Sequence, residues 1–264
     1  MALLPGPERP ALPVPAAVRS EPATTITSLG DRVVRLISPG GSESDRLLSR
    51  VNADLGGAVD AVVNFWGSDW THDVVVVATG SDEQFQQAAG GGLASQWTDI
   101  AAVTVAGRVD PVTRTMADAR ILLAPGASHM SAEALRIVLS HELFHYAARV
   151  DTALDAPRWL TEGVADFVAR PQTAVDPDAA ASTLSMPTDD DLDTPGAQRA
   201  RAYDRAWWFA RFVADTYGPA KLRDLYVAAC GVGHADLPTA IGETLGIDQA
   251  GLLPRWQRWM TSHA

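Results

Sequence analysis

Residues 141 to 145, which read HELFH, constrain this chain more than any other stretch. On an α-helix, residues four apart lie on one face about one turn from each other, so His141 and His145 can direct two imidazoles at a single metal ion. Glu142 lies beside them, too far round the helix to join them as a ligand, and can take a proton from a metal-bound water. The motif therefore predicts a helix with a metal-binding face and the chemistry of a zinc-dependent hydrolase.

The alternative is that both histidines are ordinary surface or boundary residues and that a pattern of three fixed letters arose by chance. Two observations favour the metal site. A third candidate ligand, Glu162, follows the motif after residues 146 to 161. The neighbouring residues also carry no charge, as a buried active-site helix requires: Val138, Leu139, Leu143, Phe144, Tyr146 and Ala147.

The residues after HELFH complete the candidate site. The segment up to Glu162 is long enough to finish one helix, turn, and bring a second helix back across the first. Two histidines and one glutamate leave a fourth position open for water, which distinguishes a catalytic zinc site from a closed structural one. The alternative for Glu162 is an exposed residue in the first turn of a helix, favoured there by the helix dipole.

Asp166 lies four residues after Glu162, on the same helix face. Its carboxylate can accept the second ring N–H of a ligating histidine and so fix the orientation of that ring. The alternative is an ordinary surface aspartate. Cysteine ligands are excluded, because Cys230 is the sole cysteine and cannot form an intramolecular disulfide either.

Composition limits the partners and the compartment. The chain has 264 residues, 47% of them hydrophobic, and a formal net charge of -11 without a cluster of Lys and Arg. These features argue against a nucleic-acid partner, which would need clustered cations for phosphate contacts. Residues 1 to 20 contain neither a membrane-spanning run nor a signal peptide, so the chain as it stands is predicted to be cytoplasmic. The alternative is the cell envelope or secretion, if an N-terminal anchor is missing from this sequence.

Periodicity predicts an α+β fold: a small N-terminal mixed sheet with helices in residues 29 to 130, then a helical half in residues 131 to 264. Residues 1 to 28 are Pro-rich and are predicted to form a disordered tail or linker, which leaves 29 to 264 as a single domain. Strands are expected at 33 to 37, 74 to 77, 100 to 105 and 119 to 123. Helices are expected at 47 to 63, 82 to 89, 131 to 149, 157 to 170, 202 to 217, 220 to 229, 237 to 245 and 249 to 260, with an irregular connection from 171 to 200.

Three further patterns have both a functional and a structural interpretation. Gly90 to Gly92 resembles a phosphate loop but lacks its Lys and Ser or Thr, so a flexible loop is favoured. The acidic run at 189 to 193 lacks the Gly and the closing Glu of a calcium loop, which favours a solvated loop. Trp256 and Trp259 are three residues apart; packing against the helical core is the simpler interpretation, and a sugar-binding platform is the alternative.

HELFH followed by residues 159 to 166, WLTEGVAD, resembles the gluzincin metallopeptidases, specifically the bacterial peptidase MA-like proteins related to the thermolysin and M1 aminopeptidase families. The resemblance implies a zincin-like, thermolysin-type fold. It implies Zn²⁺ bound by His141, His145 and Glu162, with Glu142 as general base. It also supports Asp166 as the residue that orients a zinc-binding histidine.

In such enzymes a Tyr or His from a downstream helix stabilises the oxyanion, and Tyr203 is our candidate here, ahead of Tyr217 and Tyr146. A peptide substrate is expected to pair with the strand at 120 to 124 as the sheet edge. The chain departs from the aminopeptidases in lacking a GxMEN-type motif. The segment between His145 and Glu162 is also shorter than in thermolysin or M1 enzymes.

The sequence therefore predicts a monomeric zinc metallopeptidase that cleaves peptide or protein substrates, more as an endopeptidase than as an aminopeptidase. The alternative is a catalytically weak or inactive peptidase-like binding module of the cell envelope. Exposed tryptophans and the Pro-rich tail would suit such a tethered module.

Overall fold

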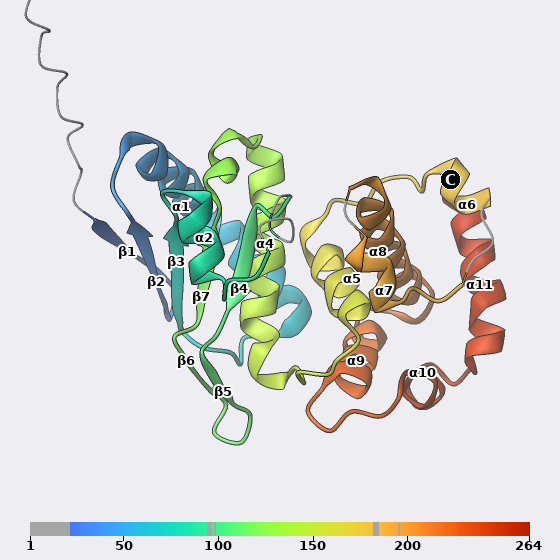
Figure 1. Ribbon diagram of the computed structural model, residues 1–264. Coiled ribbons are helices and arrows are strands. Elements are labelled where there is room, and N and C mark those ends of the chain that lie inside the picture. Colours follow the sequence, from blue (N-terminus) through green and yellow to red (C-terminus); the bar gives the residue numbers. More distant parts are fainter. Residues whose placement is uncertain (1–21, 94–96, 98, 182–184, 195) are drawn as a thin grey trace, which may run out of the picture.

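The computed structural model describes residues 22–93, 97, 99–181, 185–194 and 196–264. An N-terminal sheet with flanking helices is followed by a helical C-terminal half, which confirms the predicted α+β arrangement (Figure 1). Helix α4 (Ala132–Ala148) lies between these two parts and contacts both. Because α4 carries HELFH, the candidate site lies where the two parts meet. Within the described residues, no helix is long and apolar enough to cross a membrane.

The main sheet has five strands in the order β1-β2-β3-β7-β4. The central strands β2, β3 and β7 are parallel, and the outer strands β1 and β4 each pair antiparallel with their neighbour. Strands β5 and β6 form a separate two-stranded hairpin. The bounds are β1 Ala23–Leu29, β2 Arg32–Ser38, β3 Asp73–Ala78, β4 Ala102–Val105, β5 Arg108–Asp110, β6 Thr115–Ala117 and β7 Arg120–Leu123.

Two expectations about this sheet are wrong. Strand β1 covers residues 23 to 28 of the predicted linker, because its backbone pairs along its whole length with β2. The remainder of that linker, residues 1 to 21, lies outside the described residues. The strand predicted to be the substrate-binding edge, β7, is paired on both sides, with β3 and with β4. The edge nearest α4 is β4.

The helical segments agree with the prediction except between residues 171 and 200. That stretch contains two short helices and the first turn of α8, so it is not one irregular connection. The remaining bounds are α1 Ser42–Trp66, α2 Asp82–Ala88, η1 Pro125–His129, η2 Arg149–Asp151, α5 Arg158–Ala169, α6 Pro177–Ala181, α7 Asp189–Asp193, α8 Ala197–Tyr217, α9 Pro219–Cys230, α10 Leu237–Leu245 and α11 Gln249–Ser262.

Alternation along the strands divides the core into two layers. In β7, Ile121 and Leu123 join the main core on the side of α1 and α4, whereas Leu122 packs with Phe85 of α2 on the opposite face. The main core continues without a break from the sheet through α4 into α5, α8 and α9. This continuity fixes α4 relative to both halves of the chain.

The C-terminal tryptophans belong to this core. Trp256 is fully buried and Trp259 is 7% exposed. The interpretation that they pack against the helical core is therefore confirmed, and the alternative of a sugar-binding platform is not. Trp207 and Trp208 are also buried. The expectation of exposed tryptophans on a binding module is therefore wrong for these side chains, because α8 and α11 turn them inward against the neighbouring helices.

Candidate metal centre

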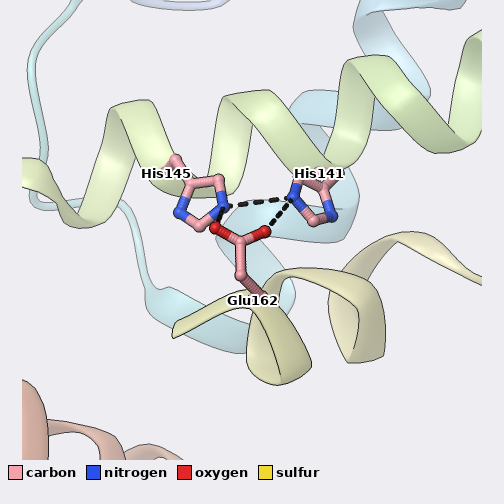
Figure 2. A group of neighbouring side chains, drawn as sticks. All are labelled: His141, His145 and Glu162. Carbon is pink, nitrogen blue, oxygen red and sulfur yellow. Dashed lines mark hydrogen bonds and ion pairs between the residues drawn. The ribbon is translucent and has the colours of Figure 1, made fainter. Parts of the chain in front are cut away.

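Helix α4, which carries the two histidines, is held in place by an N-cap and by buried apolar side chains. The helix begins with Ser131, whose hydroxyl accepts the Ala134 N–H as an N-cap, as predicted. Leu139, Leu143 and Phe144 are fully buried in the main core, where the Phe144 ring contacts Trp66 of α1 and Tyr226 of α9. His141 and His145 are left to face α5, one turn apart (Figure 2).

Helix α5 carries Glu162 and lies opposite the histidines of α4 (Figure 2). Pro157 occupies the N-cap position and has no side-chain acceptor. The Trp159 N–H instead donates a hydrogen bond to Asp189 Oδ1 of α7 at 2.8 Å. The acidic run predicted to be a solvated loop thus includes a capping residue for α5. Next to Glu162, a Cβ on Gly163 would lie 2.4 Å from Ala206 O of α8. The backbones of α5 and α8 can approach this closely only because residue 163 is glycine.

The three predicted ligands converge. His141 Nε2 lies 3.1 Å from His145 Nε2 and 3.1 Å from Glu162 Oε2, and His145 Nε2 lies 3.5 Å from Glu162 Oε1 (Figure 2). Ligands about 2.0–2.1 Å from a tetrahedral zinc ion are roughly 3.3 Å apart. The donor set and its spacing therefore fit one such ion at the centre of the group.

Asp166 lies behind the group, on the far ring nitrogen of His141. The His141 Nδ1–H donates to Asp166 Oδ1 at 2.9 Å, so Nε2 is the ring nitrogen that faces His145 and Glu162. Asp166 Oδ2 in turn accepts from Arg170 at 3.2 Å, and Arg170 also donates to Asp204 of α8 at 2.9 Å. The Arg170 guanidinium stacks 3.8 Å above the Trp207 ring. A chain of contacts thus links the candidate ligand His141 on α4 to α8.

The close approach of these groups shifts the pKa values of His141 and Glu162. Burial alone would lower the pKa of His141, but its hydrogen bonds to Asp166 and Glu162 outweigh burial and raise that pKa well above its usual value. Burial alone would raise the pKa of Glu162, yet the charge of His145 and the hydrogen bonds from both histidines hold that pKa far below its usual range. The group of residues therefore favours a positive charge at its centre, and a divalent cation could supply that charge in place of a proton.

Glu142 lies on α4 between the two histidines and is 8% exposed. Its carboxylate does not join the ligand group, in line with its place on the helix. Instead, Thr104 of the edge strand β4 places its hydroxyl 2.7 Å from Glu142 Oε2 and 2.8 Å from the Glu142 main-chain oxygen. The predicted general base is therefore held by the sheet.

Of the three candidate tyrosines, Tyr203 is the one whose hydroxyl is influenced by the charges of the site residues. It lies in the second turn of α8, where burial first, and the charges of Glu162 and Asp166 next, raise the pKa of its hydroxyl. Tyr146 donates to Asp73 O and Ala119 O within the sheet side of the molecule, and burial raises its pKa to about 12. Tyr217 lies at the far end of α8 and accepts a hydrogen bond from Arg255.

Sequence reasoning missed three residues that support the site. Thr104 holds Glu142, Arg170 holds Asp166, and Asp189 caps the helix that carries Glu162. Arg170 follows Asp166 by four residues on one helix face, a spacing typical of ion pairs that could have indicated the contact. Thr104 and Asp189 are brought to the site only by tertiary packing, and no local pattern marks them.

Comparison with solved structures finds two zinc metallopeptidases similar to this chain. The chain is similar to a variant of a two-domain M1 zinc metallopeptidase bound to L-arginine, with a TM-score of 0.50 and 16% identity over 92% of this chain. A form of such an enzyme bound to L-tryptophan gives a TM-score of 0.47 and 14% identity over 92% of this chain. The chain spans 52% of the length of each. A scan against models of protein families finds no match, and neither does a search of curated protein sequences. The first of these similarities shows that the chain has a fold like that of the M1 zinc metallopeptidase.

Proposed function

We propose that this protein is a zinc-dependent metallopeptidase that hydrolyses peptide bonds by attack of an activated water. The observation that carries the proposal is the convergence of His141, His145 and Glu162, with the Glu142 carboxylate beside them on α4. Two nitrogens and a carboxylate suit zinc and leave one coordination position for water or substrate. When bound, zinc would polarise the scissile carbonyl and lower the pKa of a water ligand.

The residues of this chain then have distinct tasks in the proposed reaction. Glu142 accepts the proton of the attacking water and delivers it to the nitrogen of the leaving amine as the C–N bond breaks. Tyr203, which its raised pKa keeps protonated, donates a hydrogen bond to the oxygen that becomes negative in the tetrahedral intermediate. Asp166 holds His141 with Nδ1 protonated and so keeps Nε2 available as a ligand.

The peptide substrate would pair with β4. Among the described residues this strand ends the sheet: it pairs antiparallel with β7 on one side, and Thr104 on its face toward α4 contacts Glu142. An extended peptide added to a sheet edge forms main-chain hydrogen bonds that place its scissile bond in register. In this position the substrate would lie directly beside the proposed general base.

We favour internal cleavage over removal of single N-terminal residues, because the chain lacks a GxMEN-type motif for the substrate amino group. The alternative is aminopeptidase action, because the similar M1 enzyme binds L-arginine, a free amino acid of the kind that an aminopeptidase releases. Peptides with a free or an acetylated N-terminus discriminate between the two modes. Equal cleavage of both supports endopeptidase action, and cleavage of the free form alone would establish aminopeptidase action.

The general-base assignment is tested with Glu142→Gln. We expect one zinc per chain in both wild type and variant, with hydrolysis of a broad peptide library lowered by about 10²–10⁴-fold in the variant. Mass spectrometry of the cleavage products measures the loss. A variant that cleaves as fast as wild type would show that Glu142 is not the base. Zinc binding without cleavage by the wild type would favour the alternative of a peptidase-like binding module.

A further inference from the structure

We propose that Thr104 is a positioning residue that fixes the Glu142 carboxylate for proton transfer and ties it to the substrate-binding strand. The inference rests on the proposed function and concerns the same site. Its basis is the pair of contacts from one hydroxyl, 2.7 Å to Glu142 Oε2 and 2.8 Å to the Glu142 main-chain oxygen. The two acceptors belong to the same residue, so the hydroxyl sets the side chain of Glu142 relative to its own backbone.

The charged acceptor is the stronger one. A threonine hydroxyl has a single proton, and a hydrogen bond to a carboxylate is roughly twice as strong as one to a neutral carbonyl. The main-chain oxygen of Glu142 also lies inside α4, where the helix supplies its own donor from the residue four positions later. The hydroxyl is therefore not required to complete the helix, and its specific effect is on the carboxylate.

The direction of the contact matters for the proposed reaction. Because the Thr104 hydroxyl binds Oε2, Oε1 would be left to accept the proton of the attacking water, and the carboxylate would remain in one rotamer throughout proton transfer. Small misplacements of a reacting group can lower a rate by about 10²-fold. Thr104 also lies in the strand that would pair with the peptide, between Val103 and Val105. The base and the substrate are thus positioned by the same four-residue strand.

The test uses the zinc-loaded protein and three substitutions. Thr104→Val removes the hydroxyl and keeps the β-branched shape that suits a strand, and Thr104→Ser restores the hydroxyl. Thr27→Val is the matched control, because Thr27 of the opposite edge strand β1 also donates to a helix residue, Asn52 of α1, far from the site along the sheet. Peptide hydrolysis and zinc affinity are measured for each protein.

We expect Thr104→Val to lower kcat by roughly 10–100-fold, with KM and zinc affinity within about twofold of wild type. Thr104→Ser should recover most of kcat, and Thr27→Val should match wild type. An unchanged kcat in Thr104→Val, or a serine variant as slow as the valine variant, would overturn the inference.

Crystal structures of the zinc-loaded wild type and Thr104 variants give a second readout that is independent of turnover. A Glu142 carboxylate that moves in Thr104→Val and returns in Thr104→Ser supports the positioning role even if no peptide is cleaved. In that case the proposed function fails and the structural inference stands. A carboxylate that keeps its position in Thr104→Val would refute the inference whatever the activity.

Discussion

The two helices that supply the candidate metal ligands are held in different ways. Helix α4 has its own N-cap, Ser131, and packs along the sheet and α1, and helix geometry places its two histidines one turn apart on the same face. Helix α5 has no capping side chain of its own and depends on Asp189 of α7 at its start and on α8 along its length. The relative position of His141 and His145 is therefore a local property, whereas the position of Glu162 depends on the packing of the C-terminal half.

This difference predicts where the site is vulnerable. Changes around α4 that spare the ligands should affect stability but leave the two imidazoles together. Changes at the contacts of α5 with α7 and α8 should also affect metal binding, because they move the carboxylate relative to the histidines. Three substitutions test this contrast, each with a matched control.

The largest effect is expected for Gly163→Ala. The added Cβ would lie 2.4 Å from Ala206 O and 2.7 Å from Ala206 C, both backbone atoms of α8, so the helices must separate next to Glu162. We expect the free energy of unfolding of the zinc-free protein to fall by about 3 kcal/mol or more, and zinc to bind more weakly. Urea unfolding and zinc titration measure the two effects.

The matched control is Gly57→Ala in α1, where an added Cβ meets no atom within 4 Å. Alanine favours the helix, so this variant should gain about 0.5–1 kcal/mol and bind zinc normally. If Gly163→Ala were as stable as wild type with the same zinc affinity, the close contact of α5 with α8 would not determine the position of Glu162.

The next effect in size is expected for Asp166→Asn. The change removes the anionic acceptor of the His141 Nδ1–H while preserving the shape of the side chain. Zinc affinity should fall by roughly 10–100-fold, a typical result for the loss of such a partner. Competition with a chelator of known affinity measures the change.

Asp204→Asn is the control for this network, because Asp204 also accepts from Arg170 but has no hydrogen bond to His141. Its zinc affinity should stay within about threefold of wild type, in contrast to the loss expected for Asp166→Asn. Equal losses in the two variants would show that the arginine network as a whole, rather than the bond to His141, governs affinity.

The smallest effect is expected for the two helix caps. Asp189→Ala removes the acceptor of the Trp159 N–H in α5, and Ser131→Ala removes the acceptor of the Ala134 N–H in α4. Each should lower the free energy of unfolding by about 1 kcal/mol. Only Asp189→Ala should also weaken zinc binding, because Glu162 lies about one turn from the start of α5 whereas His141 lies deep within α4. Zinc titrations of the two variants compare them directly, and equal affinities would contradict the asymmetry between the helices.

The parts of the fold that could be predicted from sequence are those determined by nearby residues. The helical spacing of apolar residues predicts helix α1, and the run of β-branched residues predicts strand β3. The spacing in HELFH predicts two histidines on one face of α4. Glu162 was predicted from its distance along the chain after the motif, and the structure brings it to the histidines.

The parts that could not be predicted depend on contacts between distant segments. Strand β1 reads ATTITSL next to a Pro-rich stretch, is largely exposed, and is a strand because it pairs with β2. The edge position of β4 follows from the insertion of β7 between β3 and β4, which no local pattern indicates. Thr104 reaches Glu142 for the same reason, because strand order sets which residue of the sheet faces α4.

The most direct test of this account is anomalous diffraction at the zinc edge from crystals of the zinc-loaded protein. We expect one zinc ion per chain, bound by Nε2 of His141, Nε2 of His145 and the carboxylate of Glu162, at about 2.0–2.1 Å from each nitrogen. A single peak at this position, lost in Glu162→Ala, would establish that α4 and α5 together form the metal centre. A zinc ion bound elsewhere, or one that keeps its position and occupancy without the Glu162 carboxylate, would contradict it.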